Sequence, residues 1–168
     1  APPEWPCHAA ASNDRAMAKD IQGIAGLKAL EGQHLGYSDW LDITQERVNT
    51  FADATGDHQW IHVDPERAKD GPFGGTIAHG YLTLSLGPVL MPSILTVSGV
   101  KMGVNYGADK VRFISPVKVG SRLRLGAELT RIEELPGNGA QVYMTFTFEV
   151  EGSEKPACVA DIIFRYYE

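Results

Sequence analysis

The chain has 168 residues, of which 43% are hydrophobic and 21% are charged, and its formal net charge is −6. This length and composition are typical of one globular domain with a hydrophobic core, and they exclude a disordered or fibrous chain. The acidic balance argues against a nucleic-acid partner. There is no run of 18 apolar residues, so no membrane span is expected. We therefore expect a cytoplasmic protein.

The start of the chain differs in composition from the rest. Residues 1–13 contain Pro2, Pro3 and Pro6 and lack the charged-then-apolar order of a signal peptide. We expect residues 1–33 to form a flexible or weakly helical N-terminal lead and residues 34–168 to form a single domain. Cys7 and Cys158 have no metal-ligand spacing, and we interpret them as free thiols, although a disulfide between them stays open.

The first half of the domain predicts one strand and several helices. Residues 34–43 contain the large side chains that are typical of a strand, and we expect the first strand there. Thr44 is a suitable N-cap and Gly56 a suitable C-terminal residue for an amphipathic helix over residues 45–55. Asp64-Pro65 starts a second, short helix. Residues 79–91 form a central helix that is apolar on every side and is therefore expected to be buried.

The second half of the chain alternates between apolar and polar residues, which is typical of strands with one buried face. This pattern covers residues 110–113, 122–125, 142–150 and 158–166, with turns at 116–120, 136–139 and 152–156. The last two strands are expected to form an antiparallel hairpin. A buried helix followed by an antiparallel meander predicts an α+β hot-dog fold, in which the sheet wraps around the helix.

Residues 51–80, FADATGDHQWIHVDPERAKDGPFGGTIAHG, carry the candidate chemistry. Asp57 and His62 lie five residues apart in a loop between helices, where a carboxylate and an imidazole can share a water and move its protons. Gly80 opens the central helix, whose first amides are unpaired and can stabilise a thioester oxygen that gains negative charge.

Each of these residues also has a simpler interpretation. Asp57 alone is a common turn residue, His62 alone is as often structural, and Asp64 is best explained as a helix cap. The histidines His58, His62 and His79 together with Asp57 raise the alternative of a metal site. No HxxxH or HxH pattern of these histidines lies within a predicted helix, so we expect no metal.

The order of these residues resembles the signature of the MaoC-like, R-specific enoyl-CoA hydratases, also called the hydratase 2 family. The matching elements are Gly56-Asp57, then His62, then Asp64-Pro65, Phe73-Gly74 and finally Ile77-Ala78-His79-Gly80. The resemblance covers roughly residues 35–167, with its specific part in about thirty of them. Many members carry Asn-Pro where this chain has Gln59-Trp60, and that form resembles a NodN-like subgroup.

The resemblance implies a hot-dog homodimer that hydrates trans-2-enoyl-CoA reversibly, by syn addition, to (R)-3-hydroxyacyl-CoA. Asp57 and His62 would be the catalytic pair, and the Gly80 amide would face the thioester carbonyl. We expect Gln59, Ile77 and His79 to line the substrate site beside them. Neither a metal nor another cofactor is implied, and the acyl chain would lie in a tunnel beside the central helix.

Other features leave alternatives open. Asn105 and Tyr106 can contact the thioester or the pantetheine arm, or they can simply begin a strand. Five basic residues can meet the CoA phosphates or can be solvated strand faces: Lys110, Arg112, Lys118, Arg122 and Arg124. The alternative functions are a hot-dog acyl-CoA thioesterase and a non-catalytic acyl-CoA-binding module. The thioesterases usually carry a carboxylate on or near the central helix, whereas this chain has none between Thr76 and Leu95.

Overall fold

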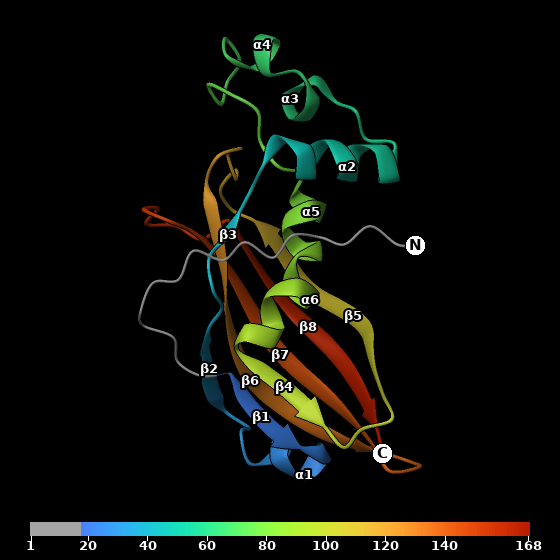
Figure 1. Ribbon diagram of the computed structural model, residues 1–168. Coiled ribbons are helices and arrows are strands. Elements are labelled where there is room, and N and C mark those ends of the chain that lie inside the picture. The colour runs from blue at the N-terminus through green and yellow to red at the C-terminus, as the bar shows by residue number, and fades with distance from the viewer. Residues whose placement is uncertain (1–17) are drawn as a thin grey trace.

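The computed structural model describes residues 18–168, and its main feature is an antiparallel sheet wrapped around a helix (Figure 1). The sheet runs in the order β2-β6-β7-β8-β5, with β3 also paired to β6. Its strands are β2 (Gln33–Tyr37), β3 (Leu41–Asp42), β5 (Met102–Phe113), β6 (Arg122–Leu135), β7 (Gly139–Val150) and β8 (Cys158–Tyr167). The expected hot-dog fold and the β7–β8 hairpin are confirmed.

The central helix is broken where the sequence analysis expected one helix over residues 79–91. It consists of α5 (Gly80–Ser85), α6 (Gly87–Leu90) and the 3-10 turn η1 (Met91–Ser93). Pro88 has no N–H to donate back into the preceding turn, which accounts for the interruption. None of the helices within residues 18–168 has the length and apolar character needed to cross a bilayer.

One face of this helix packs on the sheet. Leu82, Leu86 and Leu90 recur every four residues and are each at most 5% exposed. Burying such a side chain contributes about 1.5–3 kcal/mol. The expectation of burial on every side is wrong, because Tyr81 is 71% exposed and Val89 is 57% exposed. These two residues leave an apolar strip of the helix uncovered in the single chain.

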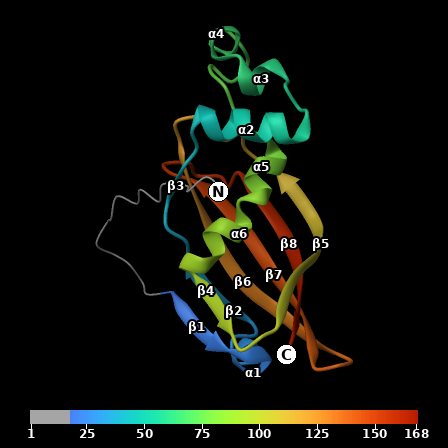
Figure 2. The same ribbon diagram turned by 45° about the vertical axis from the view of Figure 1, so that its right-hand side comes forward.

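Three further helices lie together beyond the N-terminal end of α5 in both views (Figures 1 and 2). They are α2 (Gln45–Thr55), α3 (Trp60–Val63) and α4 (Pro65–Ala68). The expected caps of α2 are confirmed, since Thr44 accepts a hydrogen bond from the Arg47 amide and Gly56 is left-handed with φ 79°. Asp64 caps α4 through the Arg67 amide. Helix α3 was not expected and places His62 on a helical turn rather than in a loop.

The opposite end of the molecule holds β1 (Lys19–Gln22), α1 (Gly23–Lys28) and β4 (Leu95–Ser98). Strands β1 and β4 form a separate parallel pair. Leu27 is fully buried in the core, and the Ile24 amide donates to the Glu168 side chain at 2.7 Å. Residues 19–28, which the sequence analysis assigned to the N-terminal lead, therefore pack as part of the fold. Residues 1–17, including Cys7, lie outside the described part of the chain.

Candidate active site

Asp57, His62 and His79 meet between α2 and the beginning of α5. Asp57 follows Gly56 and is exposed, His62 lies on α3 and is 6% exposed, and His79 directly precedes α5 and is 3% exposed. One carboxylate oxygen and one nitrogen from each ring lie within 4.8 Å of one another. The expected Asp57–His62 pair is therefore brought together, with an open side at the carboxylate.

A hydrogen bond to the backbone fixes the orientation of the His62 ring. Its Nδ1 lies 2.7 Å from the carbonyl oxygen of Ile77. Because a carbonyl oxygen can only accept, Nδ1 carries the proton in the neutral ring. The other nitrogen, Nε2, then has a free lone pair and is the basic atom of the site. Ile77 thus acts through its backbone, and its side chain is buried.

The spacing of the pair suits one shared water. A water that hydrogen-bonds to two groups at about 2.8 Å each holds them roughly 4.5 Å apart, given the tetrahedral angle between its bonds. The Asp57 carboxylate and a His62 ring nitrogen lie no more than 4.8 Å apart, within the reach of one bridging water. The arrangement can therefore bind a water, take one of its protons and orient its oxygen.

Gln45 supports His62 and was missed by the sequence analysis. Its amide nitrogen donates to the His62 carbonyl at 2.7 Å, and its Oε1 accepts from the Thr76 hydroxyl at 2.6 Å. One side chain on α2 thereby ties α3 to the segment that precedes α5. Nothing in the sequence distinguishes Gln45 from a solvated helix residue, because its partners are set by the tertiary packing.

Gly80 lies at the first position of α5 and has no room for a side chain. A Cβ there would come within 3.0–3.1 Å of three carbons of the Phe113 ring. The close approach brings the end of β5 against the start of the helix. The Gly80 amide belongs to the first turn of the helix, where backbone N–H groups have no partner within the helix.

The remaining residues expected near the substrate hold the loop in shape. The Gln59 amide lies 3.4 Å from the Asp57 carboxylate, and the Gln59 carbonyl accepts from the His62 amide at 2.9 Å. The Gln59 side chain is exposed. His79 is buried, and its Nε2 lies 2.9 Å from the backbone carbonyl of Asp57. His58 points away and pairs with Asp53 on the surface, which raises the pKa of His58.

The geometry of the two rings does not favour a metal ion. His62 and His79 are stacked with centroids 3.8 Å apart and planes at 24°. A metal must lie close to the plane of each imidazole that binds it, along the nitrogen lone pair. Nearly parallel stacked rings direct these lone pairs side by side and not toward one point. The cluster is therefore better suited to proton transfer.

Asn105 and Tyr106 lie far from this pair in their own protomer. Phe113 is the residue of β5 that reaches Gly80, and Asn105 is eight residues earlier, about 26 Å along an extended strand. The Tyr106 ring covers the Arg165 guanidinium, 3.4 Å from the ring centroid.

Most of the basic residues that were candidates for phosphate binding are engaged elsewhere. Arg122 pairs with Glu151, Arg124 with Glu149 at 2.7 Å, and Lys110 with Asp161 at 3.7 Å. The Arg112 guanidinium donates to the Val111 carbonyl. Only Lys118 lies near the glycine-rich loop, beside Gly74 and Gly75. This supports the solvated-face interpretation for four of the five.

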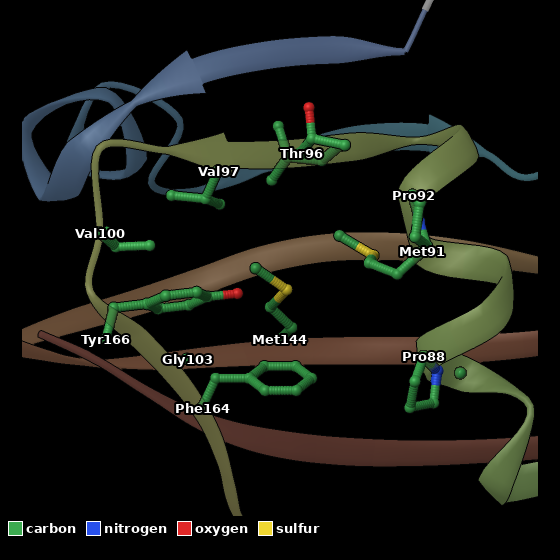
Figure 3. A pocket seen from close by; sticks show the side chains of 12 residues that line it. Pro88, Met91, Pro92, Thr96, Val97, Val100, Gly103, Met144, Phe164 and Tyr166 are labelled. Carbon is green, nitrogen blue, oxygen red and sulfur yellow. The ribbon is translucent and has the colours of Figure 1, made fainter.

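An apolar cavity of about 420 Å³ lies beside the C-terminal half of the central helix (Figure 3). Met91 and Pro88 contribute from the helix side, and Met144, Phe164 and Tyr166 from the sheet. The cavity begins at Gly87, seven residues beyond Gly80, which corresponds to about 10 Å of helix. Burial raises the pKa of the Tyr166 hydroxyl.

The fold and the site together define a hot-dog protein with a carboxylate–imidazole pair at the start of its central helix. Comparison with known proteins agrees. A sequence model of the MaoC-like domain matches residues 27–148. The chain therefore belongs to the MaoC-like domain family.

Individual relatives support the same family. The 3-hydroxyacyl-thioester dehydratase Z of Mycobacterium tuberculosis is 57% identical over 148 residues, which are 88% of this chain and 98% of the relative. Nodulation protein N of Rhizobium leguminosarum is 47% identical, over 83% of this chain and 88% of that protein. The unliganded R-hydratase PhaJ1 of Pseudomonas aeruginosa superposes with a TM-score of 0.66 at 26% identity, covering 82% of each chain.

Proposed function

We propose that this protein catalyses the reversible, R-specific hydration of 2-enoyl thioesters to 3-hydroxyacyl thioesters. The observation that carries the proposal is the Asp57–His62 pair, whose carboxylate and ring nitrogen lie within 4.8 Å of each other while Nδ1 of His62 is held by the Ile77 carbonyl. A relative with 57% identity over nearly its whole length is a 3-hydroxyacyl-thioester dehydratase, which runs the same reaction in the other direction.

The proposed step balances without a cofactor. Asp57 and the Nε2 of His62 hold the water, and Nε2 accepts one of its protons as the oxygen bonds to C3 of the substrate. The C2–C3 π electrons move toward the thioester carbonyl, whose oxygen is stabilised by the Gly80 amide. The proton then passes from the pair to C2 on the same face, which gives syn addition and returns the pair to its starting state.

The test follows the hydration of crotonyl-CoA by loss of the enoyl absorbance. We expect wild type to turn over and both Asp57→Asn and His62→Gln to lose at least 10²-fold in kcat, the range typical of general acid–base catalysis. Asp53→Asn is the matched control, because Asp53 is an exposed aspartate on α2 that pairs only with His58 among the described residues. Full activity in Asp57→Asn or His62→Gln would overturn the assignment.

The same assay separates this function from the two alternatives. A thioesterase would release free CoA, which a chromogenic thiol reagent detects. A non-catalytic module would bind acyl-CoA without turnover at any chain length. We expect no thiol release and measurable hydration, since the central helix carries no carboxylate between Thr76 and Leu95.

We also propose that the apolar cavity beside η1 receives the acyl chain. It lies along the helix that begins at Gly80, and its lining includes Met91, Met144 and Phe164. Apolar walls of this kind favour a hydrocarbon chain over a polar one. The distance of about 10 Å from Gly80 means that short acyl chains end before the cavity and longer ones enter it.

A homodimer formed through β5 is a further part of the proposal. Strand β5 is an edge of the sheet, with β8 as its only neighbour in the sheet order. Four large hydrophobic residues along this strand are between 38% and 55% exposed: Met102, Val104, Tyr106 and Phe113. A long apolar edge of this kind is a template for strand pairing with a second chain. Pairing of two β5 strands would extend the sheets edge to edge and cover these residues.

We infer a cytoplasmic location from the chemistry of Cys158. It is buried on β8 and has no disulfide partner among the described residues. Free thiols persist in reducing compartments, whereas oxidising ones favour disulfides. The proposed compartment is therefore the cytoplasm.

A further inference from the structure

His79 makes contacts that none of the roles above requires. Its ring is 3% exposed and packs between Phe51, at a centroid distance of 4.9 Å, and His62, at 3.8 Å. Its Nε2 lies 2.9 Å from the backbone carbonyl oxygen of Asp57. The same residue precedes Gly80 in the chain. One side chain thus touches both members of the catalytic pair and adjoins the proposed oxyanion amide.

These contacts determine the tautomer of His79. The Asp57 carbonyl can only accept a hydrogen bond, so Nε2 of His79 carries the proton. The other nitrogen, Nδ1, is buried and has no hydrogen-bond partner among the described residues. Protonation of Nδ1 would place both a positive charge and an unsatisfied N–H in this position, which is costly away from water.

The surroundings of His79 agree with a neutral ring. Burial is the largest influence and lowers the pKa of His79, and positive charge on His62 or His58 lowers it further. The bond to the Asp57 carbonyl and the negative charge of the Asp57 carboxylate act in the opposite direction and are outweighed. Phe51, which packs on the other face from α2, is uncharged. His79 therefore stays neutral at pH values where an ordinary histidine begins to take up a proton.

A neutral ring at this position has two consequences for the pair. It limits the tilt of the His62 ring by stacking, so that Nε2 of His62 keeps its direction. It also allows His62 to become positively charged without a second cation 3.8 Å away. The bond from Nε2 of His79 holds the turn that carries the Asp57 carboxylate. Both contacts maintain the separation of Asp57 and His62 that one shared water requires.

We propose that His79 is a positioning residue for the hydration reaction: its imidazole fixes the Asp57 turn by a hydrogen bond and the His62 ring by stacking. The proposal rests on the proposed function. His79 does not bind the substrate directly, which revises its expected place among the substrate contacts, because its ring lies beneath the pair and is buried.

Two variants separate the two contacts. His79→Phe keeps a flat ring of similar size for stacking and removes the N–H donor. His79→Gln keeps an N–H donor and removes the ring. We expect His79→Phe to lower kcat at least tenfold with less than a twofold change in KM, and His79→Gln to recover part of that loss. His58→Phe, in the same loop but exposed, is the matched control and should leave both constants unchanged.

Nitrogen NMR on the wild-type protein tests the neutral state of His79, which both the hydrogen bond and the stacking described above require. We expect the His79 ring to be neutral, with its proton on Nε2, at pH values where the exposed His58 is already protonated. Titration of His79 with the pKa of a free histidine would overturn the proposal, as would unchanged kcat in a His79→Phe variant whose melting temperature shows that it is folded. If neither variant folds, the NMR result still decides the tautomer and charge.

The two proposals can fail separately. If wild type hydrates no enoyl-CoA, the proposed function fails, whereas the NMR spectrum still tests the neutral His79. If wild type is active and His79 titrates normally, the function stands and the positioning role fails.

Discussion

His62 and Ile77 are joined by a hydrogen bond from Nδ1 to the Ile77 carbonyl oxygen at 2.7 Å. The same segment is held a second time, because the Ile77 amide donates to the Ile61 carbonyl at 3.0 Å. These two bonds fasten α3 to the strand-like residues that lead into α5. They connect the proposed base to the segment that precedes Gly80, whose amide we propose to face the thioester.

Gly80→Ala should lower kcat/KM at least tenfold. The new Cβ would lie 3.0–3.1 Å from the Phe113 ring, so either β5 or the start of α5 must shift. A displacement of about 1 Å at a reacting centre can cost as much as 10² in rate. Overpacking of this kind also destabilises a fold by about 1–3 kcal/mol. Steady-state kinetics and thermal melting measure the two effects.

The control for Gly80→Ala removes the Phe113 ring, which the new Cβ would contact. Phe113→Ala should create room for the Cβ, and the single variant shows what loss of the ring costs by itself. The combined Gly80→Ala and Phe113→Ala variant should therefore recover part of the lost activity. Full activity of Gly80→Ala alone would contradict the proposal that catalysis depends on the observed position of the Gly80 amide.

Some parts of this site could be predicted from the sequence because they depend on neighbouring residues. Thr44 and Gly56 fix the ends of α2 by capping and by a left-handed φ, and both were confirmed. Their position determines where Asp57 emerges, and the short α3 that follows brings His62 back toward it. A motif confined to some thirty residues thus contains most of the geometry of the pair.

Other parts depend on contacts between distant segments and could not be predicted. The hydrogen bonds of Gln45 and the stacking of His79 on His62 appear only when α2, α3 and α5 are packed together. The bulge in β5 between Asn105 and Gly107 shifts the register, which turns Tyr106 toward Arg165. Alternation in the sequence gives no sign of such a bulge. The exposed Tyr81 likewise depends on which face of the helix the sheet covers.

Met91→Trp should shorten the acyl chains that the enzyme accepts. Met91 lines the cavity beside η1, and an indole there would fill part of its volume of about 420 Å³. We expect kcat/KM for a twelve-carbon enoyl-CoA to fall at least tenfold and that for crotonyl-CoA to change less than twofold. Met91→Ala is the matched enlarging variant. Equal losses at both chain lengths would show that the cavity does not hold the acyl chain.

Charges on the apolar edge of β5 should disrupt the dimer. Met102 and Val104 are 51% and 38% exposed, and Lys at both positions would place like charges along the proposed strand pairing. Sedimentation or light scattering should report a dimer for wild type and a monomer for the double variant. Tyr37→Lys is the control, since Tyr37 is also exposed but lies on β2 at the other edge of the sheet. A wild-type monomer would contradict the proposed assembly.

Stability should decrease at alkaline pH because of Cys158. Burial raises the pKa of its thiol from the ordinary 9.0 to about 11. A thiol whose pKa is raised by folding stays protonated in the folded state while the unfolded chain ionises. The free energy of unfolding therefore falls as the pH rises from 9 to 11, by at most about 3 kcal/mol. Urea unfolding at several pH values measures this slope, and Cys158→Ala should flatten it. An equally steep slope in that variant would assign the effect to other groups.

The most direct test of the account is a double-mutant cycle on Asp57 and His62. If both side chains hold the same water, removing either one disables the pair, and removing the second adds little. Initial rates of crotonyl-CoA hydration should therefore be nearly as low in Asp57→Asn or His62→Gln alone as in the combined variant. A combined loss equal to the product of two independent losses would contradict a shared water, and a combined variant with wild-type rate would contradict catalysis by this pair.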